Sequence, residues 1–211
     1  MTLGIAIPTF SGHMYHLKTL LDSISLSTVL PKQVSISISS FDGDFNFDGY
    51  PFEVIVTKTN EKKNVCENRN IAANKLNTDI ISFIDGDDIS HVKRNEYIIE
   101  SFKMGSTALV HNYHIDSNVK SEWYKTNIEP INYFHGYVDT VFDDCTFAKN
   151  LKNHQDYHCA HISVKKEIFD NIKYNESIGW QVGEDGEYTR RLVGNGILIS
   201  YVSNKLSQYV H

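Results

Sequence analysis

The sequence lacks the long apolar runs and dense cysteines that mark membrane and disulfide-stapled secreted proteins. No segment approaches the roughly 20 apolar residues that a helix needs to cross a bilayer. The first residues, MTLGIAIPTF, have no basic start followed by a long apolar stretch, so we expect no signal peptide. The three cysteines, Cys66, Cys145 and Cys159, share no regular spacing. We therefore expect reduced thiols, no transmembrane segment and a cytoplasmic location.

Positive charge is also scarce. The chain has 20 Lys and Arg against 26 Asp and Glu, which gives a net charge of −6 with the ten histidines neutral. A chain of this sign has no general attraction for phosphate backbones, so we expect no nucleic-acid partner. If an anionic small molecule binds, the positive charge must be supplied locally, by a metal ion or a specific Arg. Repeats and Pro- or Ser-rich linkers are absent too, so the 211 residues are predicted to form a single domain.

What the sequence does contain is an alternation of strand-like and helix-like segments. In the first half, strands are expected at 3–7, 34–38, 53–57 and 80–84, and helices at 14–24, 64–76 and 92–103. The second half is less regular, with strands expected at 161–164 and 197–202 and helices from 165 and at 184–193. Such alternation predicts an α/β fold with a mostly parallel sheet and helices on its faces.

The strongest chemical signal is Asp85-Gly86-Asp87-Asp88, placed directly after the apolar segment IISFI. Ligands of open α/β sheets collect beyond the carboxyl ends of the strands. Three carboxylates at such a strand end repel one another unless a cation lies among them. A Mg²⁺ or Mn²⁺ ion that bridges the acids to a diphosphate relieves this repulsion. The alternative is an ordinary surface turn, because Asp-Gly favours turns in general.

Two further segments carry candidate functional residues. Arg69 falls on the same face of the 64–76 helix as Val65 and Leu76, so it must reach outward or meet a partner near the sheet. A base edge, a phosphate or an internal carboxylate would each serve. In GWQVGED at 179–185, Asp185 is a candidate general base and Trp180 offers a flat apolar face to a sugar ring. The alternative is that acids at a helix N-terminus only interact with the helix dipole.

The order and spacing of five blocks resemble the GT-A superfamily of glycosyltransferases, and most closely its inverting family-two type. The blocks are IAIPTF, ENRNIAANK, FIDGDD, HISVKKEIF and GWQVGEDGEYTRRLVGNG, and they cover nearly the whole chain. The resemblance implies a GT-A fold in which about 1–105 bind the nucleotide and about 106–211 bind the acceptor. It also implies metal-dependent, inverting transfer of a hexose from a nucleoside-diphosphate sugar, a UDP-sugar, to a sugar hydroxyl of a glycan. The chain is similar as well to the N-terminal glycosyltransferase domain of a multidomain protein of large DNA viruses of algae, which implies a longer chain in the host cytoplasm.

The resemblance also implies roles for individual residues. For the donor, these are Thr9 at the base, Arg69 at the base or phosphates, Asp85 at the ribose, Gly86 as a further donor-binding residue, and Asp87 with His211 on Mn²⁺ or Mg²⁺. On the acceptor side, Asp185 would be the base, with Glu184 and Trp180 holding the acceptor. One departure concerns the base. The family's second strand ends in Asp-Asp-Gly-Ser, one Asp of which reads uracil, whereas this chain has SSFDG at 39–43. Uracil recognition could pass to Ser39, Asp42 or the backbone, and guanine stays an alternative.

Two other patterns contain metal-binding residue types. The segment 44–49 fits the start of an EF-hand loop, but Ile55 stands where the bidentate Glu belongs, so we expect a polar loop. The cluster His154, His158, Cys159 and His161 matches no closed zinc spacing. Two other functions are possible alternatives, a nucleotidyltransferase and a non-catalytic sugar-binding module. The first would need a Gly- and Lys/Arg-rich loop near the N-terminus, and the second has no need of a diphosphate site.

Overall fold

The structure is a computed structural model, and it describes most of the chain. The described residues are 1–118, 120, 122–128, 130–131, 133–135, 140–142, 147–150, 155–178 and 183–210, with the backbone alone described within 132–159.

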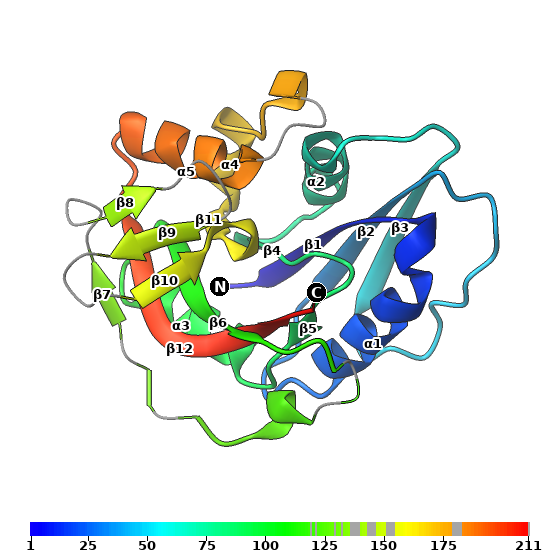
Figure 1. Ribbon diagram of the computed structural model, residues 1–211, viewed down its shortest axis with the longest axis horizontal. Coiled ribbons are helices and arrows are strands. Elements are labelled where there is room, and N and C mark those ends of the chain that lie inside the picture. The colour runs from blue at the N-terminus through cyan, green and yellow to red at the C-terminus, as the bar shows by residue number, and fades with distance from the viewer. Residues whose placement is uncertain are drawn as a thin grey trace.

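The centre of the described chain is one large twisted sheet (Figure 1). Its strands are β1 (Leu3–Phe10), β2 (Gln33–Ser39), β3 (Glu53–Thr59), β4 (Ile80–Phe83), β5 (Ile89–Ser90), β6 (Ala108–Ile115), β7 (Tyr133–His135), β11 (Ser163–Lys165) and β12 (Ile199–Tyr209). The order is β3-β2-β1-β4-β11-β6-β12-β5, and β7 pairs with β12. A small second sheet holds β8 (Thr140–Phe142), β9 (Phe147–Asn150) and β10 (Gln155–His158).

The four strands β1 to β4 run parallel, because each returns through a crossover. In β1, Ile5 faces Val34 of β2 on one side and Ser82 of β4 on the other. The strand β11 is antiparallel to both of its neighbours, whereas β12 is parallel to β6. The predicted α/β fold with a mostly parallel sheet is therefore confirmed. The strand β6 was not predicted, and β12 continues seven residues beyond the expected end at residue 202.

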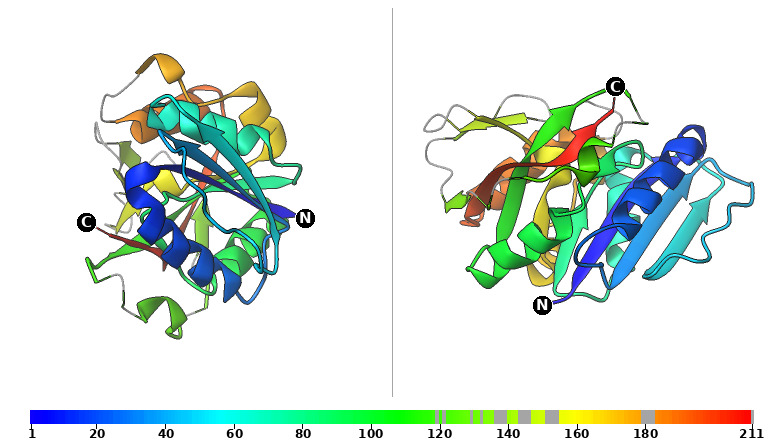
Figure 2. Two further views of the ribbon diagram at one scale, coloured as in Figure 1. Left: turned by 90° about the vertical axis from the view of Figure 1, so that its right-hand side faces the viewer. Right: turned by 90° about the horizontal axis from the view of Figure 1, so that it is seen from below.

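Helices cover both faces of the sheet (Figure 2). They are α1 (Met14–Ser25), α2 (Val65–Asn74), α3 (Arg94–Lys103), α4 (Lys166–Asn171) and α5 (Glu184–Gly194), with 3-10 turns η1 (Ser11–His13), η2 (Trp123–Lys125), η3 (Cys159–His161) and η4 (Glu176–Ile178). On one face, α2, α4 and α5 share a core with Ala6, Phe83 and Tyr201. On the other, α1 packs on Ile5 of β1, and α3 packs on Ile80 of β4.

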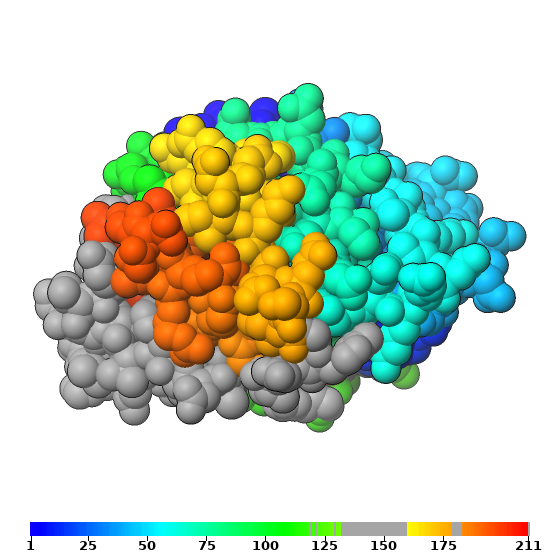
Figure 3. Space-filling model, turned by 90° about the horizontal axis from the view of Figure 1, so that it is seen from above, coloured from blue at the N-terminus to red at the C-terminus, as the bar shows by residue number. Residues whose placement is uncertain are grey.

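The two halves of the chain meet along α2. In the space-filling view, α4 and α5 lie beside the segment around α2 (Figure 3). The start of α2 is fixed by a capping box, in which the Asn64 side chain accepts the Glu67 amide and the Glu67 carboxylate accepts the Asn64 amide, both at 2.9 Å. The cap satisfies two amide groups at the start of the helix, and Asn68 and Arg69 in the turn that follows are buried. Among the described residues, no helix has the length and apolar content to cross a bilayer.

Candidate active site

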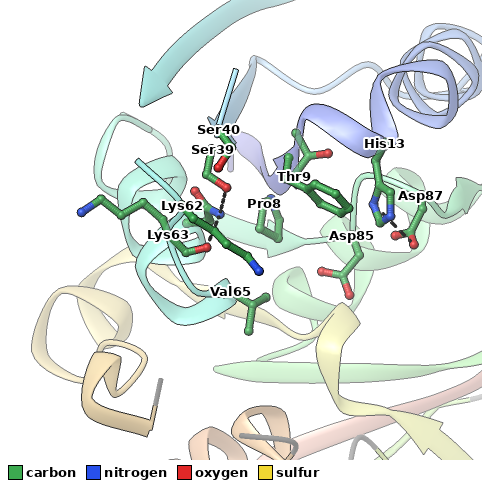
Figure 4. A pocket seen from close by; sticks show the side chains of 12 residues that line it. Pro8, Thr9, His13, Ser39, Ser40, Lys62, Lys63, Val65, Asp85 and Asp87 are labelled. Atoms are coloured by element: carbon green, nitrogen blue, oxygen red, sulfur yellow. Dashed lines mark hydrogen bonds and ion pairs between the residues drawn. The ribbon is translucent and has the colours of Figure 1, made fainter. Parts of the chain in front are cut away.

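A cavity of about 420 Å³ lies at the carboxyl edge of β1, β2 and β4 (Figure 4). Parallel strands bring their carboxyl ends to the same edge, so residues far apart in sequence meet there. Four of the predicted donor-site and metal-site residues line the cavity: Thr9, Ser39, Asp85 and Asp87. Asp42 is exposed on the loop between β2 and β3 and is not among the lining residues.

Gly86 shapes the cavity without lining it. A Cβ atom at this position would lie 2.5 Å from Thr9 Oγ1 and 3.2 Å from the Pro8 carbonyl oxygen. The Gly86 amide donates to that same carbonyl at 3.2 Å. A glycine is therefore required because the acidic turn packs directly on the end of β1, and this contact holds Asp85 and Asp87 beside Thr9.

The acidic turn has two sides. Asp85 and Asp87 line the cavity, whereas Asp88 is 1% exposed and turns into the protein. Its carboxylate lies 2.6 Å from His161 Nε2 and accepts the Val210 amide at 3.2 Å. His161 Nδ1 is 2.6 Å from Ser207 Oγ. The expectation that all three acids share one cation is therefore corrected, because the third is a buried link to the last strand.

Several lining residues were not singled out from the sequence. Phe10 is 43% exposed beside the cavity, and His13 Nδ1 lies 3.6 Å from Asp87 Oδ2. Lys62 and Lys63 supply positive charge, and Lys63 forms ion pairs with Glu61 and Glu67. The signal available in the sequence was the pair of lysines directly before the capping residue Asn64. These lysines add to the local cation that a net-negative chain needs for an anionic ligand.

Arg69 is buried behind the cavity and lies at the centre of a group of three acids. Its Nη2 donates to the two oxygens of Asp85 at 3.0 and 3.3 Å. Its Nη1 donates to Glu184 at 3.2 Å and to Asp185. The guanidinium carbon is 5.1 Å from the centre of the Tyr174 ring. Of the partners considered from the sequence, the internal carboxylate is the one that this structure shows.

Burial and charge shift the pKa values in this group in opposite ways. Burial alone would lower the pKa of Arg69, but Asp185 and Asp85 raise it well above its ordinary value. Burial raises the pKa of Asp185 to about 8, although the guanidinium of Arg69 opposes this shift. At the cavity, burial and the neighbouring Asp85 raise the pKa of Asp87. The site thus contains a carboxyl group whose pKa is suited to accept a proton near neutral pH.

Some predicted site residues lie outside the described residues, namely Trp180 and His211, as do the side chains of His154, His158 and Cys159. Within the part of the chain that is described, no three His, Cys, Asp or Glu side chains are grouped to hold a metal. Asp44 and Asp48 are exposed on the loop between β2 and β3, which is the polar loop expected there. A metal bound at Asp87 would therefore take most of its ligands from the donor phosphates, from water or from residues outside the described part of the chain.

Comparison with known proteins gives one family and several solved structures. Residues 44–172, more than half of the chain, match the family model of glycosyl transferase family 2. The crystal structure of S. aureus TarS 1–349 has a TM-score of 0.65 at 14% identity, covering 100% of this chain and 60% of that chain. Its complex with UDP-GlcNAc has a TM-score of 0.68 at 13% identity, covering 100% and 59%, and its complex with UDP has 0.65 at 13%, covering 100% and 61%.

At such low identity the likeness establishes the fold, which is the GT-A arrangement of a curled, mostly parallel sheet flanked by helices. The chain spans about three fifths of the length of that TarS fragment. A search of curated proteins found no match.

Proposed function

Since this chain belongs to glycosyl transferase family 2, whose family model matches residues 44–172, we propose that it transfers a hexose from a UDP-sugar to a hydroxyl of a glycan, with inversion. The observation that carries the proposal is the cavity beyond β1, β2 and β4, where two carboxylates and two lysines gather around one space. Family membership also favours glycosyl transfer over nucleotidyl transfer or simple sugar binding. S. aureus TarS binds UDP-GlcNAc and UDP on the same fold, which supports a uridine nucleotide as the donor.

Asp87 fits a Mn²⁺ or Mg²⁺ ion that is shared with the donor. Such ions are held by one or two carboxylates and take their other ligands from phosphates and water. The Asp87 side chain is 33% exposed and lies at the cavity, so it can reach a ligand there. Burial and the neighbouring Asp85 raise the pKa of Asp87, so a cation at this carboxylate would stabilise its ionised form. When bound, the ion would supply Lewis-acid stabilisation of the departing diphosphate. His211 is proposed as a further ligand.

The remaining donor contacts come from the chain itself. Thr9 and the exposed ring of Phe10 would form a wall for the flat base, Asp85 would receive the ribose, and Lys62 would supply positive charge to the anionic part of the donor, since Lys63 is already paired with Glu61 and Glu67. Asp85 also bonds Arg69, so the donor cavity and the buried acids behind it share one residue. This shared contact would transmit the position of the donor to α5.

Asp185 is proposed as the general base. The acceptor hydroxyl must lose its proton as it attacks the anomeric carbon, and a carboxylate with a raised pKa accepts that proton readily. Arg69 orients Asp185, and the adjacent Glu184 would hold the acceptor together with Trp180. The acceptor is then a glycan hydroxyl that approaches from the side of α5.

Calorimetry of the purified chain with UDP and GDP, with and without Mn²⁺, tests the proposal. We expect UDP to bind, and more tightly with Mn²⁺. Asp87→Ala should remove the Mn²⁺-dependent part of the affinity, whereas the control Asp48→Ala, which removes an exposed acid from the loop before β3, should not. If neither nucleotide binds under any condition, the proposed function is wrong. If Asp87→Ala retains the Mn²⁺ effect, Asp87 is not a ligand.

A further inference from the structure

Two serines of β2 are connected to one asparagine of α2. Ser37 and Ser39 lie on the same face of the strand, because alternate residues of a strand share a face. The Ser37 hydroxyl is 2.8 Å from Asn68 Oδ1, and the Ser39 hydroxyl is 3.2 Å from Asn68 Nδ2. Asn68 Nδ2 also lies 3.4 Å from the Lys63 carbonyl oxygen. All three side chains are buried, with Asn68 4% exposed.

The Lys63 carbonyl determines which group donates in each of these three hydrogen bonds. A backbone carbonyl only accepts hydrogen bonds, so the end of the Asn68 amide that faces it must be the NH₂ group. Nδ2 therefore donates to Ser39 Oγ, and Oδ1 accepts the proton of Ser37. A flipped amide would set Oδ1 against the carbonyl oxygen of Lys63, which is repulsive. Ser39 thus receives a hydrogen bond, and its own proton remains to be donated.

The Ser39 hydroxyl can donate its proton into the cavity. Ser39 lines the cavity (Figure 4), and no second hydrogen bond to its hydroxyl occurs among the described residues. The strand β2 lies two positions from β4 in the sheet, so Ser39 is about 10 Å from the strand that carries Asp85 and Asp87. The acids mark the diphosphate end of the cavity. Ser39 therefore stands at the far end of a cavity whose lining also includes the apolar Val65 and the ring of Phe10.

We infer that Ser39 donates a hydrogen bond to the C4 keto oxygen of a pyrimidine base, and that Asn68 is the positioning residue that fixes this polarity. The inference rests on the proposed function and specifies how its donor is selected. The C4 edge is the part of the ring remote from the ribose, so it reaches the end of the cavity away from Asp85. Uracil has an accepting oxygen at C4, whereas cytosine has a donating amino group there. To accept from that amino group, Ser39 would have to use its second lone pair and turn its proton away from the base, and it would lose the hydrogen bond that uracil provides, so this wall selects UDP over CDP.

Titration calorimetry with UDP and CDP, both in the presence of Mn²⁺, tests the inference. One neutral hydrogen bond corresponds to an affinity difference of about three- to tenfold, so the wild-type chain should prefer UDP by at least that factor. Ser39→Ala should weaken the binding of UDP by about three- to tenfold and leave the affinity for CDP nearly unchanged. The ratio of the two affinities should then be close to one. Ser35→Ala is the matched control. It removes a hydroxyl from the same face of β2 that has no partner among the described residues and does not line the cavity, so the ratio should stay as in wild type.

A second variant tests the role of Asn68. In Asn68→Asp, both side-chain oxygens are acceptors, so Ser39 would donate its proton to the introduced carboxylate and present lone pairs to the base. The preference should then shift from UDP toward CDP, beyond the loss seen in Ser39→Ala. Thermal unfolding of each variant shows whether it is folded. Equal binding of UDP and CDP by wild type, or an unchanged ratio in Ser39→Ala, overturns the inference alone. If neither nucleotide binds, the proposed function fails and this inference fails with it.

Discussion

Two arginines are buried to the same degree in this molecule, yet they have opposite surroundings. Arg69 of α2 is 1% exposed and meets the carboxylates of Asp85, Glu184 and Asp185, a group that we call the Arg69 cluster. Arg94 of α3 is 0% exposed, and its partners are neutral. Its Nε donates to His111 Nε2 at 3.1 Å, and its Nη2 donates to Ser82 Oγ and to the Phe83 carbonyl, both at 2.8 Å. We call this group the Arg94 cluster.

The difference shows that the partners of a buried arginine, and not its burial alone, decide the direction in which its pKa shifts. Acids raise the pKa of Arg69 above its ordinary value, whereas burial lowers the pKa of Arg94 with only the more distant Asp88 opposing it. The Arg69 cluster is in contact with the cavity through Asp85, and the Arg94 cluster joins α3 to β4 and β6. We therefore propose that the Arg69 cluster takes part in the reaction, whereas the Arg94 cluster stabilises the fold.

The largest effect that separates the two clusters is expected from Asp185→Asn. The amide cannot accept the proton of the attacking hydroxyl, so kcat should fall by about 10²- to 10⁴-fold, the usual contribution of a general base. UDP affinity should change little, because Asp185 does not line the cavity. Steady-state transfer assays and calorimetry measure the two quantities. Glu187→Gln is the matched control, since Glu187 is an acid in the same first turn of α5 that pairs with Arg191. Wild-type turnover in Asp185→Asn would place the base elsewhere.

Replacing each arginine by methionine sharpens the comparison in terms of stability. Arg69→Met leaves three buried or half-buried carboxylates without their cation and should lower the free energy of unfolding by about 3–5 kcal/mol. Arg94→Met leaves only neutral acceptors unpaired, and about 1–3 kcal/mol is expected. Urea unfolding followed by circular dichroism measures both. Transfer by the folded protein should be lost in Arg69→Met and kept in Arg94→Met. A larger loss of stability in Arg94→Met, or a loss of transfer there, would reverse the assignment.

A smaller effect is expected from pH. Burial raises the pKa of Asp185 to about 8, above the ordinary carboxyl value of the unfolded chain. The folded state then binds more protons than the unfolded state between these two values, so the contribution of Asp185 to the free energy of unfolding falls as the pH rises toward 8. Transfer should change in the opposite sense and increase up to about pH 8, because the base must be unprotonated.

Transfer rates between pH 5 and pH 9, and urea unfolding of wild type and Asp185→Asn at both ends of this range, check the two signs. The stability difference between the two proteins isolates Asp185 from other buried acids such as Asp88. A transfer rate that is already constant at pH 5 would show that Asp185 keeps an ordinary pKa.

The first half of the fold could be predicted because its strands are apolar and separated by helices of clear period. The strand β6 was missed, since His111, Tyr113 and His114 interrupt the apolar pattern of ALVHNYHI. In the structure this strand lies between β11 and β12, and its polar His111 is buried because Arg94 bonds it. A buried polar residue that is paired by a distant side chain has no signature in the local sequence.

The candidate site shows the same limit. Helical spacing correctly predicts that Arg69 lies on the buried face of α2, but its partners Glu184 and Asp185 are 115 and 116 residues away. The sequence also does not show which acid of the turn after β4 faces inward. Asp88 does so because His161, 73 residues later, lies behind it. Long-range pairs of this kind depend on the order of strands in the sheet, which the chain specifies only once it is folded.

The bond between Asp88 and the Val210 amide has a practical consequence for handling this polypeptide. It joins the turn that carries Asp87 to the end of β12, so trimming the chain before Val210 would release that turn as well as the strand. An affinity tag or fusion partner is better attached ahead of β1, because the cavity lies at the other, carboxyl end of that strand. The tail of β12 should therefore be kept intact in any shortened version of the polypeptide, because it holds the turn that carries the proposed metal ligand Asp87.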